Sequence, residues 1–594
     1  MTVSGADSES AIPSVVPALR LSGNTRGRPN FVHLALAALL FAFFAVFLVW
    51  PILQVVVGGF VRPGGGVTLG YVALVFQDPV LRGGLFKAVL IAVLVTVLSL
   101  VISVPLSVLS VRYEFPGRRL LGGLMLVPLV LPPFVGAIGM RLVLGRFGPL
   151  THLFGNPDLG IDWLGKYRLA GIVVVEALHL YPVLLLNLQA ALANIDPAME
   201  QAAANLGAGR WTVFRKVTLP LARPGLFAGS TLVLIWSFTE LGTPLMFSYY
   251  EVTPVQVFHL LTDVSNSPVP FALVVVMLVA SVALYVVGKV VLGRGFDAAT
   301  TKASIATPVK RLRRGRAALA AAPFALVFLL AVLPHVAVVL TSVTETGAWY
   351  RTVLPNDLTL GHYGQALVDE LAFPSIRNSL LYASLATLVA AGVGLAAAVL
   401  IVRSDVPGRQ VIDALCMLPL AVPGLVLAFG YLAISISFKR WLGDATPFWL
   451  DVQTWPVALL VVAYAARRLP YVVRSAVAGL QQTPRDLELA AANLGARRST
   501  VLLRITVPLI AANLVAGGLL AFAFAMLEVS DSLVLAQRSK YYPITKAILD
   551  LSQRLGDGPY IASALGVWAM LLLTLTILTA NSLLGRRMGA IFRV

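Results

Sequence analysis

Apolar stretches separated by short polar segments run through almost the whole chain. Twelve of them contain about 20 residues or more, the length that an α-helix needs to cross roughly 30 Å of hydrocarbon. The pattern predicts an all-α polytopic membrane protein with twelve transmembrane helices. The expected intervals are 32–58, 86–111, 120–144, 169–192, 225–248, 271–292, 317–342, 378–402, 411–435, 457–480, 511–535 and 562–585.

The first apolar stretch follows a polar start, residues 1–30, which we expect to be a disordered cytosolic segment. The stretch is long and lacks a small-residue cleavage site, so it is interpreted as a retained span and not as a signal peptide.

Composition excludes a soluble globular protein, because 58% of the residues are hydrophobic and only 12% are charged. The net charge of +18 is explained by the way the chain is oriented in the membrane. Lys and Arg are about twice as frequent in the loops and tails of one side as on the other, which places both termini in the cytosol. The densest basic run lies in residues 293–316 and suits anionic lipid better than nucleic acid, so no nucleic-acid partner is expected.

A 21-residue phrase occurs twice, at 200–220 and at 488–508, with a constant offset of 495 − 207 = 288. Earlier pairs, such as Pro132 with Pro423, are offset by 291. Each copy belongs to a module of six spans, and an even number of spans returns the chain to the same side. The repeat is therefore parallel, with its pseudo-twofold axis along the membrane normal. The modules are 31–292 and 317–594, joined by the basic cytosolic linker 293–316.

The repeated phrase is a polar helix, a glycine and a second amphipathic helix. Asp196 with Pro197, and Thr483 with Pro484, are expected to start the first helix in each copy. The glycines accept the left-handed conformation that ends a helix. An apolar stripe follows at Val213, Phe214 and Val217, and at Val501, Leu502 and Ile505. One copy alone could lie on lipid as an interfacial helix. Two copies about an axis favour docking to a partner of matching symmetry.

The doubled phrase resembles the EAA loop of the membrane subunits of bacterial ATP-binding-cassette (ABC) importers. This resemblance implies a type I ABC importer fold, with a six-helix domain present twice. It also implies that the loop couples to an ATPase subunit. The coupling residues implied are Glu200, Ala203, Gly207, Phe214 and Pro220, with Glu488, Ala491, Gly495, Leu502 and Pro508. The chain departs from the family pattern where Gln201 and Leu489 replace the usual glutamate, one position after Glu200 and Glu488.

The resemblance implies two copies of a cytosolic ATP-binding subunit, an extracytoplasmic solute-binding protein and a surrounding bilayer as partners. The chain has no G-x-x-x-x-G-K-[ST] phosphate loop, so ATP and Mg would bind to the partner subunit and no cofactor to this chain. We expect this chain to have no enzymatic activity and no metal site, although Glu176 and His179, three residues apart, could supply two metal ligands.

Charged and proline residues inside apolar spans are candidates for the translocation pathway. The candidates are Glu176, His179, Glu240, Arg467, Arg468, Glu528, Pro132 and Pro423. Two interpretations remain open. Either the carboxylates pair with the arginines of the tenth span and lock helices together, or some of these groups line the route and sense the cargo. Arg474 could instead snorkel at its span end. The prolines either kink their helices statically or bend them at a gate.

The cargo is the least determined property. The segments 238–245 and 467–474 are similar to the ferric-iron importer branch of the family, which implies uptake of ferric iron. The alternatives within the same machinery are a phosphonate, a sugar phosphate, thiamine or a polyamine. A secondary transporter driven by an ion gradient, or a channel, would explain the spans but not the paired loops.

Overall fold

The computed structural model describes residues 31–62, 65–145, 148–153, 167–263, 267–292, 309–350 and 352–584. Within them the protein is helical, apart from two short strands and a few isolated bridges. The expected N-terminal segment 1–30 and residues 293–308 of the expected linker lie outside this description.

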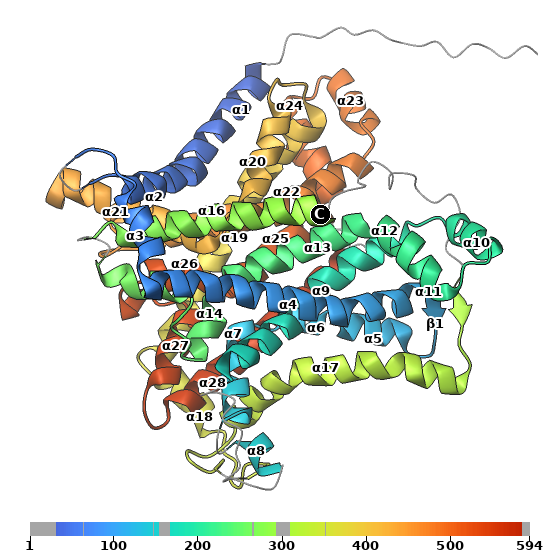
Figure 1. Cartoon of the computed structure of the whole chain (residues 1–594). Coiled ribbons are helices and arrows are strands. Elements are labelled where there is room, and N and C mark those ends of the chain that lie inside the picture. Colours follow the sequence, from blue (N-terminus) through green and yellow to red (C-terminus); the bar gives the residue numbers. More distant parts are fainter. Residues whose placement is uncertain are drawn as a thin grey trace, which may run out of the picture.

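Long helices dominate the first half (Figure 1). Its helices are α1 (Phe31–Phe44), α2 (Trp50–Phe60), α3 (Gly70–Gln77), α4 (Pro79–Arg112), α5 (Arg118–Leu124), α6 (Val127–Val130), α7 (Pro133–Val143), α8 (Pro149–Leu153), α9 (Arg168–Ala193), α10 (Pro197–Asn205), α11 (Arg210–Val213), α12 (Leu219–Leu221), α13 (Arg223–Phe238), α14 (Gly242–Met246), α15 (Thr253–His259) and α16 (Val269–Leu292).

The second half repeats this order. Its helices are α17 (Arg314–Ser342), α18 (Gly361–Val368), α19 (Ala372–Arg403), α20 (Arg409–Ala421), α21 (Gly424–Leu442), α22 (Val457–Gln482), α23 (Asp486–Asn493), α24 (Arg498–Val501), α25 (Val507–Met526), α26 (Ser530–Leu535), α27 (Ile544–Gln553) and α28 (Gly558–Leu584). A two-stranded parallel sheet of β1 (Tyr113–Glu114) and β2 (Lys310–Arg311) joins the loop after α4 to the chain before α17.

Among the described residues, nine helices are long and apolar enough to cross a membrane, or up to eleven if two bent pairs each count as one span. The tenth expected interval, 457–480, is the 26-residue helix α22, which carries Arg467, Arg468 and Arg474. Each of the twelve expected intervals thus contains a helix or a broken helix, and the protein is a multi-pass membrane protein.

The third and ninth expected spans are broken at equivalent prolines. Pro132 precedes α7 and Pro423 precedes α21, each with extended backbone at the break. The segments before and after Pro132 meet at 91°. A proline lacks the backbone N–H that would continue the helix, so each helix breaks at the proline that was expected to interrupt it.

The fifth and eleventh expected spans end earlier than the apolar pattern suggested. Helix α13 stops at Phe238 and α25 stops at Met526, and a break of three residues separates each from the next short helix. Glu240 and Glu528 lie in these breaks and not within a continuous helix. Glu240 accepts hydrogen bonds from the N–H groups of Gly242 (3.1 Å) and Thr243 (3.2 Å), so its side chain caps α14.

The first membrane span of each half packs on the other half. Helix α2 contacts α21, and α17 contacts α7. At both contacts a glycine lies against a proline carbonyl. A methyl group added to Gly139 would overlap the carbonyl oxygen of Pro334, and one added to Gly430 would overlap that of Pro51. The two modules are therefore interlocked.

Candidate coupling loops and central cavity

The first repeated loop folds as a helix, a left-handed glycine and a second helix. The Asp196 side chain accepts a hydrogen bond from the N–H of Ala198 (2.9 Å) and caps α10, with Pro197 at its first position. Gly207 has φ +84°, and no atom lies within 4 Å of the place where its Cβ would be. Helix α11 continues through one wide turn, 214–218, into α12, which contains Pro220.

The second loop has the same course. Gly495 has φ +82°, and α24 continues through the equivalent wide turn 502–506 into α25, which contains Pro508. Its start differs from the expectation, because α23 begins at Asp486 and not after Thr483. Thr483 donates its hydroxyl to the carbonyl of Gly479 (3.0 Å), while Arg485 is the residue that precedes α23 and gives it no side-chain cap.

Burial divides each loop into an inner and an outer surface. Glu200, Ala203 and Phe214, and their counterparts Glu488, Ala491 and Leu502, are half-buried. Leu206 and Leu494, which precede the two glycines, are each 89% exposed. Further exposed apolar side chains of the loops are Met199, Trp211, Leu487, Leu489 and Leu503. Each loop thus presents apolar side chains outward on a polar segment, which is typical of an interaction surface.

Each glutamate anchors its loop to a long helix that lies two spans earlier in the chain. Arg112 is the last residue of α4. Its two terminal guanidinium nitrogens, Nη1 and Nη2, pair with the carboxylate of Glu200. Thr218 donates its hydroxyl to the same carboxylate (2.5 Å). Sequence reasoning missed Arg112 and Thr218 as partners of Glu200, although Thr218 lies within the repeated phrase 200–220.

The second loop repeats this anchor. Arg403, the last residue of α19, pairs with Glu488 at 3.1 Å, and Thr506 donates to Glu488 at 3.1 Å. The two loops are therefore anchored at equivalent helix ends, α10 at the end of α4 and α23 at the end of α19.

The halves enclose a cavity of about 170 Å³. It is lined by all of the pathway candidates except Pro132, whose neighbour Pro133 takes that place: Glu176, His179, Glu240, Arg467, Arg468, Glu528 and Pro423. Trp236, Thr239, Tyr471 and Phe524 also line it. Side chains from spans three, four, five, nine, ten and eleven thus meet in one space, whereas Pro132 is buried beside it.

On the first-half side, Glu176 and His179 project from one face of α9. Ser237 donates its hydroxyl to one carboxylate oxygen of Glu176. The ring Nδ1 of His179 lies 2.7 Å from the carbonyl oxygen of Pro128. Since a carbonyl only accepts hydrogen bonds, Nδ1 carries the proton in this contact, and in the neutral ring Nε2 then keeps its lone pair.

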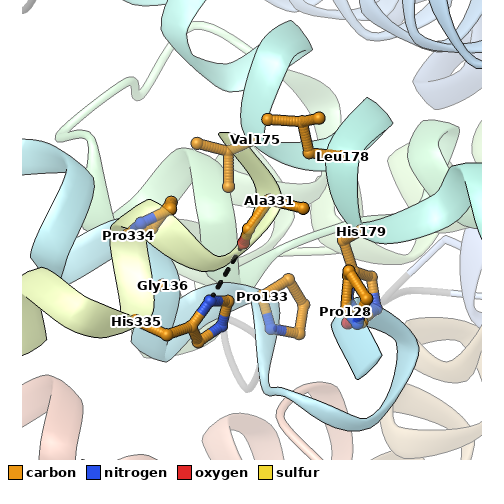
Figure 2. A pocket seen from close by; sticks show the side chains of 9 residues that line it. All are labelled: Pro128, Pro133, Gly136, Val175, Leu178, His179, Ala331, Pro334 and His335. Carbon is orange, nitrogen blue, oxygen red and sulfur yellow. Dashed lines mark hydrogen bonds between the residues drawn. The ribbon is translucent and has the colours of Figure 1, made fainter. Parts of the chain in front are cut away.

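His179 also borders a second, much smaller space, of about 10 Å³, which is the size of one water molecule (Figure 2). His335 of α17 lines the opposite part of this space and approaches the carbonyl of Ala331 through Nδ1 (3.3 Å). Its Nε2 is buried and has no hydrogen-bond partner among the described residues. His335 was not identified from the sequence, because nothing near it marks its contact with the first half.

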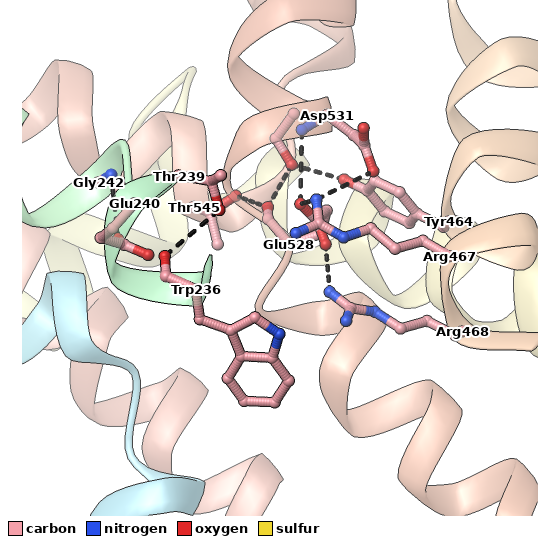
Figure 3. Close-up of polar contacts among 11 residues, drawn as sticks. Trp236, Thr239, Glu240, Gly242, Tyr464, Arg467, Arg468, Glu528, Asp531 and Thr545 are labelled. Atoms are coloured by element: carbon pink, nitrogen blue, oxygen red, sulfur yellow. Dashed lines mark hydrogen bonds and ion pairs between the residues drawn. The ribbon is translucent and has the colours of Figure 1, made fainter. Parts of the chain in front are cut away.

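On the second-half side, charged groups form a buried network (Figure 3). Arg467 lies 2.7 Å from one carboxylate oxygen of Glu528, and Arg468 pairs with the other. Arg467 also lies 3.8 Å from the carboxylate of Asp531, which is fully buried. The Tyr464 and Ser532 hydroxyls are hydrogen-bonded at 2.6 Å, and Thr545 donates to the Glu528 carbonyl (2.8 Å). Asp531 was not selected as a pathway candidate from the sequence.

The interpretation that carboxylates of spans four, five and eleven all pair with arginines is correct only for Glu528. Glu176 accepts a hydrogen bond from Ser237 of α13. Glu240 accepts from backbone N–H groups that the break after α13 leaves free. Arg474, expected to extend toward the membrane surface at the end of its span, forms an ion pair with Asp413 at 3.4 Å. In the described part of the chain, no group of three or more His, Cys, Asp or Glu side chains is arranged to hold a metal ion.

Comparison with known proteins agrees with the duplication. The family described as binding-protein-dependent transport system inner membrane component matches the chain twice, at residues 103–297 and 389–589. The putative ferric transport system permease protein FbpB of Haemophilus influenzae is 29% identical over 416 residues, covering 68% of this chain and 62% of that protein. The ferric transport system permease protein of Actinobacillus pleuropneumoniae is 29% identical over 460 residues, covering 74% of this chain and 62% of that protein.

A probable ABC transporter permease protein of Sinorhizobium fredii is 28% identical over 518 residues, covering 84% of this chain and 87% of that protein. The chain spans about 62% of the length of the two ferric permeases that it matches. Both family matches contain one repeated loop, one half of the cavity lining and one broken span. The chain belongs to the family of binding-protein-dependent transport system inner membrane components, and it contains the family's domain twice.

Proposed function

We propose that this chain is the permease of an ABC importer, with the cavity between its halves as part of the translocation pathway. The observation that carries the proposal is the pair of equivalent loops. Each loop turns at a left-handed glycine, exposes a leucine beside that glycine and is anchored by an arginine–glutamate pair. A separate motor with twofold symmetry would fit two such loops, and a secondary transporter has no use for them.

The partners follow from this assignment. Two copies of a cytosolic ATP-binding subunit would engage the loops that contain Gly207 and Gly495, and ATP and Mg would be held there. An extracytoplasmic solute-binding protein would deliver the cargo. Both termini would then lie in the cytosol, on the side of the loops. ATP binding would supply the free energy that shifts the inward–outward equilibrium, since it favours one conformation over the other.

We further propose ferric iron as the cargo. The names of two relatives, each matching about two thirds or more of this chain, support this cargo. The cavity adds support from chemistry. It contains three carboxylates, and two of them form no ion pair with an arginine among the described residues. Carboxylate oxygens are the ligands that hard cations prefer.

Reconstitution of the chain with its ATPase subunit and binding protein in liposomes tests the proposal. We expect radioactive ferric iron supplied on the binding protein to accumulate only when ATP is inside the compartment that contains the ATPase. A matched preparation with an ATPase subunit unable to hydrolyse ATP is the control. Uptake that persists in this control and is abolished by an uncoupler would contradict the proposal and favour a gradient-driven transporter.

A further inference from the structure

Two carboxylates of the central cavity, those of Glu176 and Glu240, form no ion pair with a described residue. One oxygen of Glu176 accepts from Ser237, and the other is buried without any hydrogen-bond partner there. Both backbone bonds to Glu240 go to its Oε1, and its Oε2 accepts none from the described residues. Ser237 and Glu240 are three residues apart at the end of α13, so the two carboxylates approach the cavity from adjacent positions.

The cationic groups of the cavity are already engaged. Both guanidinium groups, those of Arg467 and Arg468, point at Glu528, and Arg467 also faces Asp531 (Figure 3). An anionic cargo such as a phosphonate would have to displace Glu528 from them. A cation would meet oxygens with lone pairs that no described residue uses. The geometry of the cavity therefore favours a positively charged cargo.

His179 lies beside the carboxylates with a fixed ring. Its Nδ1 donates to the carbonyl of Pro128. In the neutral ring the lone pair is then on Nε2, which takes no part in that hydrogen bond. A ligand nitrogen is commonly oriented in this way by a carbonyl on its other side. Its counterpart in the second half, 467 − 179 = 288 residues later, is Arg467. The two halves thus share a fold but place different chemical groups, a histidine and an arginine, at equivalent positions of the cavity.

We propose that Glu176 and Glu240, with His179 beside them, form a passage site for a hard multivalent cation on the first-half side of the cavity. This inference rests on the proposed function and names the groups that select its cargo. The side chains do not form a preassembled chelate in the described structure. Weak binding suits a passage site, because the cation must leave as readily as it enters.

Terbium luminescence tests binding directly, because Trp236 lines the same cavity and can sensitise a bound Tb³⁺ ion. The full chain with its ATPase subunits in lipid nanodiscs would be titrated with Tb³⁺. We expect saturable emission that Ga³⁺ displaces and that falls at least about 10-fold in a Glu176→Gln/Glu240→Gln variant. A tenfold loss corresponds to about 1.4 kcal/mol of binding free energy. Glutamine keeps the acceptor oxygens that Ser237, Gly242 and Thr243 use, so the fold is retained.

The matched control is Glu251→Gln, which removes an exposed carboxylate that pairs with Lys87 outside the cavity. In the reconstituted importer we expect the cavity variant to lose ferric uptake at least about 10-fold while ATP hydrolysis stimulated by the binding protein stays within about twofold. Unchanged Tb³⁺ emission and unchanged uptake in the cavity variant would overturn the passage site. If the unmodified complex binds Tb³⁺ through Glu176 and Glu240 but transports no iron, the proposed cargo fails and the cation site stands.

Discussion

Arg112 and Glu200 join the end of one long helix to the start of the exposed loop that follows two spans later. Two guanidinium nitrogens meet two carboxylate oxygens, and Thr218 adds a hydrogen bond from the far end of the loop. Arg403 and Glu488 repeat the arrangement in the second half. A force applied to either loop would therefore reach a membrane-spanning helix through one short contact.

Breaking this contact should uncouple transport from ATP hydrolysis. In Glu200→Gln the loop keeps an acceptor for Thr218 but loses its charged partner for Arg112. We expect ferric uptake to fall several-fold while ATP hydrolysis in the reconstituted complex continues, because the loop still docks. The paired reversal Arg112→Glu with Glu200→Arg should restore part of the uptake, and a reversal no better than the single variants would contradict the positioning role.

The anchor should also be insensitive to pH in the physiological range. Burial raises the pKa of Glu200, but hydrogen bonds from Arg112 and Thr218 and the charge of Arg112 outweigh it, so the pKa lies below its ordinary value. A lowered pKa stabilises the folded contact above the ordinary pKa, and this stabilisation is lost as pH falls through the lowered value.

We therefore expect a spin label on Leu206→Cys to keep the same mobility from about pH 8 to about pH 5 and to loosen only at lower pH. The Glu200→Gln variant is the control, in which mobility should be high throughout. Loosening of the unmodified loop near neutral pH would rule out the ionised pair.

The glycines of the two loops should be replaceable only by residues that accept a left-handed backbone. Both have φ above +80° and open space around the position of a Cβ, so any cost comes from backbone strain and not from a clash. A β-branched residue in this conformation costs about 1–2 kcal/mol, and asparagine costs less. We expect Gly207→Val and Gly495→Val to impair transport-linked ATP hydrolysis while Gly207→Asn and Gly495→Asn retain most of it. Equal activity of all four variants would show that the turn does not matter.

The glycine contacts between the halves should control stability. Adding a methyl group at Gly139 drives it into the carbonyl of Pro334, and overpacking of this kind costs about 1–3 kcal/mol. Gly139→Ala and Gly430→Ala should therefore lower the thermal unfolding temperature in detergent. Gly392→Ala in α19 is the control, since nothing lies within 4 Å of the added methyl group there. A loss of stability equal to that of the control would argue against the interlocked packing.

Much of this architecture follows from the sequence, for identifiable reasons. The spans were predicted because hydrocarbon thickness fixes the length of an apolar helix. The breaks at Pro132 and Pro423 and the turns at Gly207 and Gly495 were predicted because proline and glycine restrict or permit specific backbone conformations.

Other features depend on contacts between distant segments. The apolar pattern runs on past Glu240, so only its capping bonds to Gly242 and Thr243 reveal that α13 has already ended. The packing of α17 on α7 depends on Gly139 and Pro334, which are almost two hundred residues apart. Likewise, charge spacing along the sequence did not show that Arg467 and Arg468 pair with Glu528 and not with Glu176 or Glu240.

Cysteine cross-linking of the two loops tests the central claim most directly. The single native cysteine, Cys416, is buried, so Leu206→Cys and Leu494→Cys each add one accessible thiol. In the assembled complex we expect each variant to form a cross-link with an ATPase subunit, and the two together to capture two subunits. Loops labelled from opposite sides of the membrane, or a cross-link at only one of them, would contradict a permease that is moved by a separate motor at two equivalent points.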